Sequence, residues 1–356
     1  MPASNSARRG RSRRAPEYNQ EPRWADYSDT DLLQVRVKDL KVSFEGSWLQ
    51  SCLDGLHAEL AARGLRMRAH AWLSDEWFSP HDTPGIAFPF YLAHPRLARL
   101  ERKMMYEVEG GTRRECMRIL RHEAGHVIQR LYGVHRRKRW RDLFGQSAKP
   151  YPVHYRPNPT SKNYVQHLRR WYAQCHPDED FAETFAVWLT PRSSWKKRYE
   201  DWPRALEKLR YVDELMAELA SAPVPAKRRF EVDPIKGSSI TLEEHYADKI
   251  ARFSVDKPHV LDRELKKIFA ADAKGPAAST FVKRNHGDIR RAVSRWTGDY
   301  QLPIEHALDD ITDRCRVLKL RANGSERKMR QELTSLLVSR FVVAMYSSSR
   351  HHSFAV

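Results

Sequence analysis

The sequence lacks an apolar run long enough to cross a membrane, and this absence excludes a protein with several membrane spans. A membrane helix needs roughly 18 apolar residues. The most apolar helical stretch, Leu333 to Tyr346, is shorter and is interrupted by Arg340, so we interpret it as a core helix and predict no transmembrane segment. The first residues, up to about Arg23, carry clustered arginines and no apolar stretch, which is not the pattern of a secretory signal.

Cysteine is scarce, and the few cysteines lie far apart with no CxxC pair. Such spacing does not favour a cysteine-type zinc site or a disulfide framework. Because free thiols persist in a reducing compartment, we predict a cytoplasmic protein. The four residues are Cys52, Cys116, Cys175 and Cys315.

Acidic residues are outnumbered, with 45 Asp and Glu against 63 Lys and Arg and a formal net charge of +18. The excess is spread along this basic protein: +4 in residues 1–25, +8 in residues 26–239 and +6 in residues 240–356. Apolar residues make up 41% and charged residues 30%, which excludes a collagen-like or mostly disordered chain. The charge therefore says more about the surroundings in which the protein works than about its chemistry.

The 356 residues suffice for about two domains. We predict a disordered basic tail over residues 1–25, an α+β domain over 26–220, a linker over 221–239 and a helical domain of unknown role over 240–356. The last of these shows no cluster with the spacing of metal ligands.

Alternating or continuous apolar runs predict short strands, and a spacing of three to four residues predicts helices. A helix is expected over residues 48–60, and nearly everything after Thr112 is expected to be helical. The predicted strands are residues 33–37, 65–72, 86–92 and 105–109, and the predicted C-terminal helices are residues 241–254, 260–271, 278–297, 303–318 and 325–347.

The strongest chemical signal is the HExxH motif formed by His122, Glu123 and His126. Residues four apart lie on one face of a helix, so both imidazoles can reach one metal ion. The glutamate between them can take a proton from a metal-bound water. The competing interpretation, a pair of core histidines, is less favoured because the apolar stripe of this helix lies roughly opposite the two histidines.

The local sequence predicts that this motif is helical. Thr112 and Glu115 fit the capping box with which helices begin. A catalytic zinc usually takes three protein ligands, but the metzincin pattern is excluded because Gln129 and Tyr132 stand where that class has glycine and histidine. The third ligand must therefore lie downstream.

The best downstream candidate is Glu179, in a predicted helix whose apolar residues face the other way. Glu183, one turn later, could accept a hydrogen bond from a ligating histidine. Acidic residues also favour the first turn of a helix without any metal. His176, Asp178 and Asp180 are alternative ligands.

The HEAGH motif followed by the segment EDFAE resembles the gluzincin clan of zinc metallopeptidases, and the Glu-x-x-Ala-Glu pattern resembles the catalytic domain of the anthrax lethal factor type. The stretch from about Trp72 to Leu189 also resembles bacterial proteins described as zinc-binding metallopeptidases. This resemblance, over about a third of the chain, implies a zincin-like domain within residues 26–220 that hydrolyses peptide or protein substrates. It implies Zn²⁺ on His122, His126 and Glu179, with Glu123 as general base.

The lethal factor type also has a tyrosine shortly before the ligand glutamate that stabilises the oxyanion. Tyr172 is the first candidate for this role, and Tyr164, two turns earlier on the same predicted helix, is the second. A half-buried structural tyrosine is an equally good interpretation of each.

Two alternatives to an autonomous peptidase remain. The basic run His135 to Arg141 and the arginine tail suggest a nucleic-acid-associated protease or DNA-binding protein, although a solvated basic loop is the preferred interpretation of the run. The second alternative is an inactive metalloprotease fold that binds or regulates a partner. The complete set of motif residues argues against it.

Overall fold

The computed structural model describes residues 21–152, 155, 157–158, 160–253 and 261–347. The larger helices and the strands are α1 (Asp29–Leu33), α2 (Trp48–Ala62), β1 (His70–Ser74), β2 (Gly85–Pro89), α3 (Pro95–Met105), α4 (Arg113–Tyr132), α5 (Lys138–Phe144), α6 (Pro177–Leu189), α7 (Trp195–Arg198), α8 (Pro203–Ser221), α9 (Leu242–Phe253), α10 (Asp262–Ile268), β3 (Phe269–Ala270), α11 (Ala278–Thr297), α12 (Gln301–Val317), β4 (Arg321–Ala322) and α13 (Glu326–Ser347). Short 3₁₀ helices are η1 (Arg23–Asp26), η2 (Val37–Leu40), η3 (Phe90–Ala93), η4 (Val134–Arg136), η5 (Arg169–Gln174) and η6 (Ile235–Gly237).

Two small sheets accompany the helices, so the chain is helix-rich with an α+β composition. In the first sheet, β1 and β2 are parallel, with Ala71 opposite Ile86. All five residues of β2 are buried, and β2 packs on α4. In the second sheet, β3 and β4 form a two-residue antiparallel pair. No helix of the described ranges combines the length and apolarity that a bilayer crossing requires.

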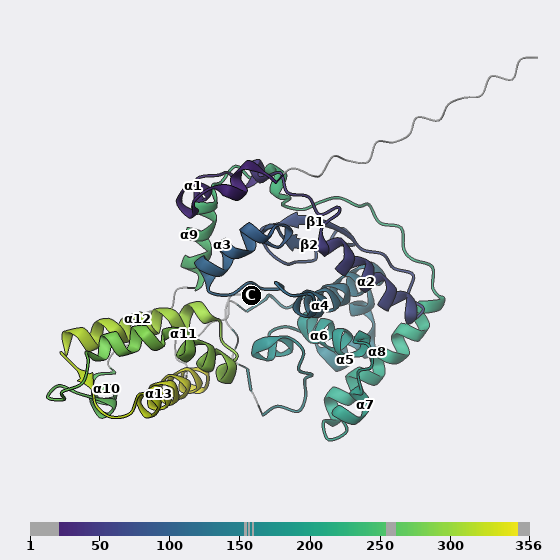
Figure 1. The fold of residues 1–356 in the computed structure, drawn as a ribbon. Coiled ribbons are helices and arrows are strands. Elements are labelled where there is room, and N and C mark those ends of the chain that lie inside the picture. The colour runs from purple at the N-terminus through teal and green to yellow at the C-terminus, as the bar shows by residue number, and fades with distance from the viewer. Residues whose placement is uncertain (1–20, 153–154, 156, 159, 254–260, 348–356) are drawn as a thin grey trace, which may run out of the picture.

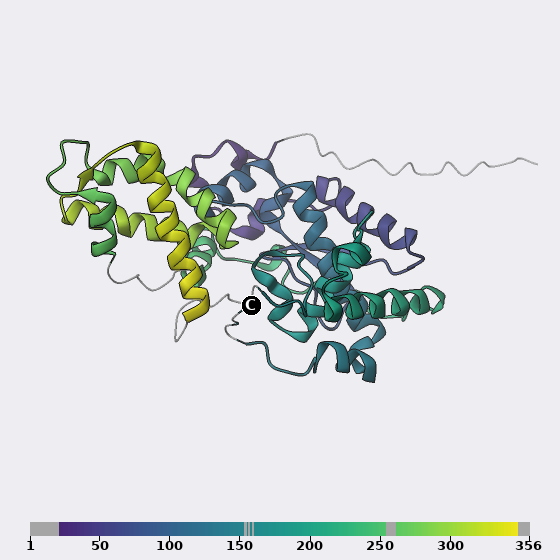
Figure 2. The ribbon, with the colours of Figure 1, turned by 90° about the horizontal axis from the view of Figure 1, so that it is seen from below.

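Two large hydrophobic clusters form the interior. The first extends from Trp24 through α2, α4, α6 and α8, and it includes Leu242 and Tyr246 of α9. The second contains the apolar faces of α10 to α13. Figures 1 and 2 show these four helices grouped together beside the part of the chain that carries α4 and α6. The boundaries predicted at residues 220 and 240 remain predictions, with α9 packed on the first cluster.

Contacts join the second group of helices to the segment around η5. The Arg170 guanidinium donates to the Asp299 carboxylate just before α12, and it lies 3.7 Å from the centre of the Tyr300 ring. Arg170 and Trp171 both have left-handed backbone, with φ of 63° and 53°. Such conformations cost about 1–3 kcal/mol each in residues other than glycine, so surrounding contacts must hold this segment.

Several predicted elements are wrong in type. Residues 33–37 form no strand, because the chain turns from α1 into η2, and only Arg36 makes a single bridge, to Thr241. Residues 105–109 follow the end of α3, where Tyr106 has a φ of 63°, so the alternation there does not mark a strand. The predicted helix over residues 48–60 is confirmed as α2.

The structure describes only the last part of the predicted basic tail, residues 21–25. Residues 1–20 of the predicted basic tail lie outside the described residues. Trp24, within the same predicted tail, is buried, and its indole N–H donates to the Leu40 carbonyl at 2.9 Å. The folded part of the chain therefore includes this residue.

Candidate metal centre

Capping residues fix both ends of helix α4. The Thr112 hydroxyl accepts a hydrogen bond from the backbone N–H of Glu115 at 3.2 Å, which confirms the predicted cap. The helix stops at Gly133, whose φ of 61° glycine adopts without steric cost. Between these ends, His122, Glu123 and His126 lie on one continuous helix.

Helix α6 is fixed in the same way and packs closely on α4. The His176 imidazole accepts from the backbone N–H of Asp178 at 3.1 Å, and Pro177 occupies the first helical turn. The helices touch at Gly125, where a Cβ atom would lie 2.8 Å from the Cα of Ala182. The small residues at this crossing let the two helix backbones approach.

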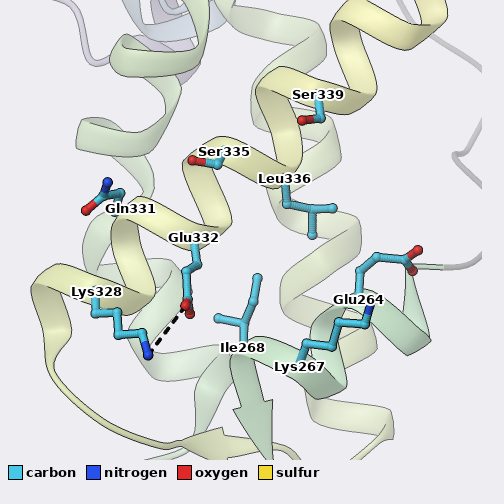
Figure 3. Close-up of a pocket in the computed structure, with 9 residues that line it drawn as sticks. All are labelled: Glu264, Lys267, Ile268, Lys328, Gln331, Glu332, Ser335, Leu336 and Ser339. Atoms are coloured by element: carbon cyan, nitrogen blue, oxygen red, sulfur yellow. Dashed lines mark ion pairs between the residues drawn. The ribbon is translucent and has the colours of Figure 1, made fainter.

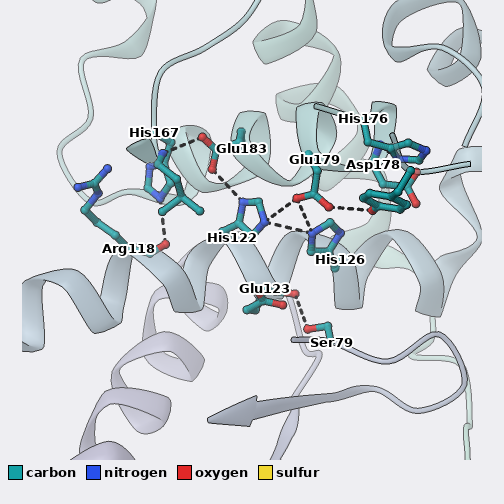
Figure 4. Close-up of polar contacts among 12 residues, drawn as sticks. Ser79, Arg118, His122, Glu123, His126, His167, His176, Asp178, Glu179 and Glu183 are labelled. Atoms are coloured by element: carbon teal, nitrogen blue, oxygen red, sulfur yellow. Dashed lines mark hydrogen bonds and ion pairs between the residues drawn. The ribbon is translucent and has the colours of Figure 1, made fainter. Parts of the chain in front are cut away.

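This approach brings three potential ligand atoms together in what we call the His–His–Glu cluster: His122, His126 and Glu179 (Figure 4). The Nε2 atoms of the two histidines are 3.1 Å apart. Glu179 Oε2 lies 3.0 Å from Nε2 of His122 and 3.2 Å from Nε2 of His126. All three residues are buried, with exposed fractions of 2%, 5% and 4%.

The hydrogen bonds around His122 determine which of its nitrogens is free to bind a metal. Nδ1 lies 2.8 Å from Glu183 Oε1, so it is the nitrogen that carries the proton in a neutral imidazole. The other oxygen of Glu183 accepts from the backbone N–H of Leu168 at 2.7 Å, which fixes the carboxylate. The Nε2 lone pair of His122 then points at the lone pairs of Glu179 and His126.

Charge interactions within the cluster shift the pKa values of His122 and Glu179 in opposite directions. Burial opposes charge on His122, but Glu179 and Glu183 raise its pKa well above the usual range. Burial likewise disfavours the Glu179 carboxylate, yet His126 and His122 hold its pKa well below the ordinary value. Both directions reflect the attraction between imidazole and carboxylate groups at these short distances.

The donor set fits zinc. A tetrahedral zinc with bonds of about 2.0–2.1 Å holds its ligand atoms about 3.3–3.4 Å apart. The observed separations of 3.0–3.2 Å are close to this. Two imidazole nitrogens and one carboxylate oxygen are also ligands that zinc prefers.

Glu123 lies beside the cluster. Its carboxylate atom Oε2 is buried without a hydrogen-bond partner among the described residues, while its backbone carbonyl accepts from the Ser79 hydroxyl at 3.2 Å (Figure 4). Burying a carboxylate oxygen without a hydrogen-bond partner costs stability, and such atoms in folded proteins often have a catalytic role. Accepting a proton would be such a role for Glu123.

The two candidate tyrosines occupy different places. The Tyr172 ring lies 5.7 Å from the His122 ring, centre to centre. Burial, followed by the Glu179 carboxylate, raises the pKa of Tyr172 well above its ordinary value. Tyr164 instead covers the ammonium group of Lys208, 4.3 Å from the ring centre. The single helix predicted to carry both is wrong, because residues 164–168 are not helical and η5 begins only at Arg169.

Sequence reasoning missed Tyr151. Its hydroxyl donates to Glu179 Oε1 at 2.7 Å, and its ring stacks on the His176 imidazole at 3.9 Å between centres. No periodicity marks this residue, which lies between two prolines in a segment without helix or strand. The sequence indicates only that a tyrosine lies within about 30 residues of the predicted ligand Glu179.

The alternative ligands have other contacts. Asp180 forms a buried ion pair with Lys208 at 2.6 Å. His176 caps α6 and lies 2.9 Å from the Lys149 carbonyl through Nε2. Asp178 is buried beside Glu179, but it is not in the cluster.

The basic run at residues 135–141 is mainly helical, within η4 and α5, and only partly solvated. Arg137 forms a two-pronged ion pair with Glu218 of α8, and Arg139 pairs with Glu214. Trp140, in the middle of the run, is fully buried. These pairs neutralise part of the charge that suggested a nucleic-acid surface.

A second group of potential ligands, unexpected from the sequence, consists of His286, Glu305 and Asp309. Glu305 already pairs with Arg290 at 2.6 Å and with His286 at 3.0 Å. The adjacent guanidinium opposes a metal cation, so this group is explained as an ion-pair network between α11 and α12.

Comparison with known proteins agrees with the geometry. A family model described as "putative zinc-binding metallo-peptidase" matches residues 97–198. No curated protein and no solved structure matches the chain. The matched stretch runs from α3 to α7 and contains the whole His–His–Glu cluster together with Glu123, Glu183 and Tyr172.

Proposed function

We propose that the chain is a zinc-dependent metallopeptidase of the gluzincin type that hydrolyses peptide bonds. The observation that carries this proposal is the convergence of His122, His126 and Glu179 from two helices at separations that suit tetrahedral zinc. Bound zinc would supply a Lewis acid for polarising the substrate carbonyl. The matched zinc-binding family supports the same assignment.

Glu123 acts as the general base. Its unpaired carboxylate oxygen takes a proton from the attacking water and then delivers it to the leaving amide nitrogen. One carboxylate can act first as a base and then as an acid, because the proton that it takes from water is the one that it gives to the leaving nitrogen.

Tyr172 stabilises the negative charge that develops on the substrate oxygen. A phenol is protonated at neutral pH even at its ordinary pKa of about 10, and the pKa of Tyr172 is higher still. Its hydroxyl can therefore donate a hydrogen bond. Tyr164, held over Lys208, takes no part in this step. Glu183 orients the His122 imidazole through Nδ1 and thereby directs Nε2 at the metal.

Metal analysis combined with peptide hydrolysis tests the proposal. The wild-type protein is expected to retain about one zinc per chain after dialysis, and His126→Ala is expected to lose it. Glu123→Gln should keep zinc and lose turnover of a mixed peptide library. His306→Ala, which removes an imidazole from α12, serves as the matched control and should match the wild type in both measurements.

The outcomes separate the alternatives. A wild-type chain that takes up no zinc refutes the metal site. Zinc uptake with no hydrolysis by the wild type favours an inactive binding module, and full turnover by Glu123→Gln refutes the role given to Glu123.

A further inference from the structure

An arginine-lined pocket lies on the first half of α4, apart from the His–His–Glu cluster. Its volume is about 710 Å³, and residues of α4, α6, α7 and the segment before η5 line it. None of the cluster residues is part of this lining. Five of the residues that line it are arginines, which makes its surroundings strongly cationic: Arg113, Arg114, Arg118, Arg121 and Arg198.

Most of this positive charge is not neutralised by ion pairs. Among the described residues, only Arg121 of the five forms an ion pair, with both oxygens of Glu59 at 2.7 Å. Arg113 donates to the Ser51 hydroxyl at 2.9 Å, a neutral partner. Four formal positive charges therefore remain around one concavity.

The pKa of the half-buried Arg118 is lowered by burial and by neighbouring arginines. Burial lowers its pKa, and the neighbouring charges of Arg169 and Arg114 act in the same direction, although the Glu183 carboxylate opposes them. That carboxylate is already bonded to His122 and to the Leu168 N–H, so it is not available to the pocket. An added anion would relieve the repulsion.

Another large concavity has a lining of mixed charge. It lies between α10 and α13, has a volume of about 570 Å³, and mixes acidic with basic side chains (Figure 3). Lys328 and Glu332 lie one turn apart on α13, with Lys328 Nζ 3.8 Å from Glu332 Oε1. Its lining does not favour a ligand of either charge, whereas none of the described residues that line the arginine-lined pocket carries a carboxylate.

Guanidinium groups bind phosphate through paired hydrogen bonds, and the positive end of the α4 dipole lies at Arg113, the first residue of that helix. The volume is in the range of small-molecule sites. We propose that this pocket binds a small molecule that carries consecutive phosphate groups. Four unneutralised charges match three or four anionic oxygens better than a single carboxylate does, and no phenyl or indole ring lines the pocket for a base to stack on.

The pocket is distinct from the candidate metal centre, since its lining includes neither the His–His–Glu cluster nor Glu123. His167 lines it, and Nε2 of this residue lies 2.9 Å from the Arg118 carbonyl. The next residue, Leu168, donates to Glu183. This segment therefore bonds to Arg118 at the pocket and to Glu183, the partner of His122, and Figure 4 shows Arg118 and His167 on the side of His122 away from Glu179.

Calorimetric titration of the full chain with inorganic tripolyphosphate tests the proposal. Arg114→Glu and Arg198→Glu, combined in one variant, alter two exposed side chains without opening the core. We expect one binding site per chain in the wild type and a loss of affinity of at least roughly tenfold in the variant. Arg99→Glu combined with Arg102→Glu, two exposed arginines of α3 outside the pocket, makes the same change in net charge; this matched control should bind like the wild type. Because tripolyphosphate chelates zinc equally in all three proteins, only their difference reports on the pocket.

Two further ligands identify the source of the phosphates. Equal affinity for ATP and tripolyphosphate would show that the phosphate chain alone is recognised, and tighter ATP binding would add a nucleoside contact; both support the proposal. No binding of tripolyphosphate at about 50 mM salt, or equal binding by wild type and variant with circular dichroism unchanged, overturns it. Binding of a short single-stranded DNA in place of tripolyphosphate overturns it in favour of a nucleic-acid surface.

Discussion

Replacing Gly125 by alanine should destabilise the protein, although helix propensity alone predicts the opposite. Gly125 lies inside α4, where alanine is better than glycine by about 1 kcal/mol. The added Cβ, however, would lie 2.8 Å from Ala182 Cα, 3.2 Å from its carbonyl oxygen and 3.3 Å from its Cβ. The first two are backbone atoms of α6, so no side-chain rotation relieves the clash and the helices must separate.

The size of the effect follows from these two opposing contributions. Overpacking a close contact costs about 1–3 kcal/mol, and a clash with backbone belongs at the upper end. Subtracting the propensity gain of about 1 kcal/mol leaves a net loss of about 1–2 kcal/mol in the free energy of unfolding. Moving α6 away from α4 also moves Glu179 away from the two histidines, so zinc affinity should fall with stability.

Urea denaturation followed by circular dichroism measures the first effect, and competition with a chromophoric chelator measures the second. Gly287→Ala is the matched control, because Gly287 is also inside a helix, but its Cβ would meet only the flexible end of Arg291, at 3.1 Å. This control should be stabilised by about 0.5–1 kcal/mol. If Gly125→Ala is as stable as Gly287→Ala, the close contact between α4 and α6 is refuted.

Two other predictions concern the stabilisation of the oxyanion and the dependence of stability on pH. Tyr172→Phe should lower kcat by roughly 10²-fold while zinc content and KM stay near wild type, and Tyr164→Phe should leave kcat unchanged; the reverse pattern would refute the assignment. Burial and the nearby Lys249 charge lower the pKa of His245 to about 4. Because this folded-state pKa is below the unfolded value of about 6.5, His245 contributes up to about 3 kcal/mol of stability above pH 6.5 that is lost as the pH falls toward 4. His245→Gln should flatten the measured dependence of unfolding free energy on pH in that window, and an unchanged slope would refute the neutral buried state.

The sequence predicts those parts of the site that depend on residues close together in the chain. The cap at Thr112, the spacing of His122 and His126, and the opposed apolar stripe each depend on residues within one or two turns. They place the motif on α4 without knowledge of the rest of the chain. The C-terminal helices were predicted nearly to the residue for α11 and α13 for the same reason.

What the sequence does not predict depends on contacts between distant segments. Tyr151 reaches Glu179 because its ring stacks on His176, which follows it by 25 residues. Leu168 lies against Glu183 in a segment that the periodicity assigned to a helix. The alternation at residues 33–37 misled in a similar way, since a turn into η2 and a single bridge to Thr241 replaced the expected strand. Tertiary contacts override local preference in each case.

The contact between Arg170 and Asp299 joins residues 129 positions apart, and this separation has a consequence for synthesis on the ribosome. At 5–20 residues per second, about 6–26 s pass between the two residues. Throughout this interval the nascent chain already contains His122, His126 and Glu179, while the left-handed residues Arg170 and Trp171 lack their distant partner. The segment beside Tyr172 therefore acquires its final support only when the start of α12 emerges, after the metal ligands have been made.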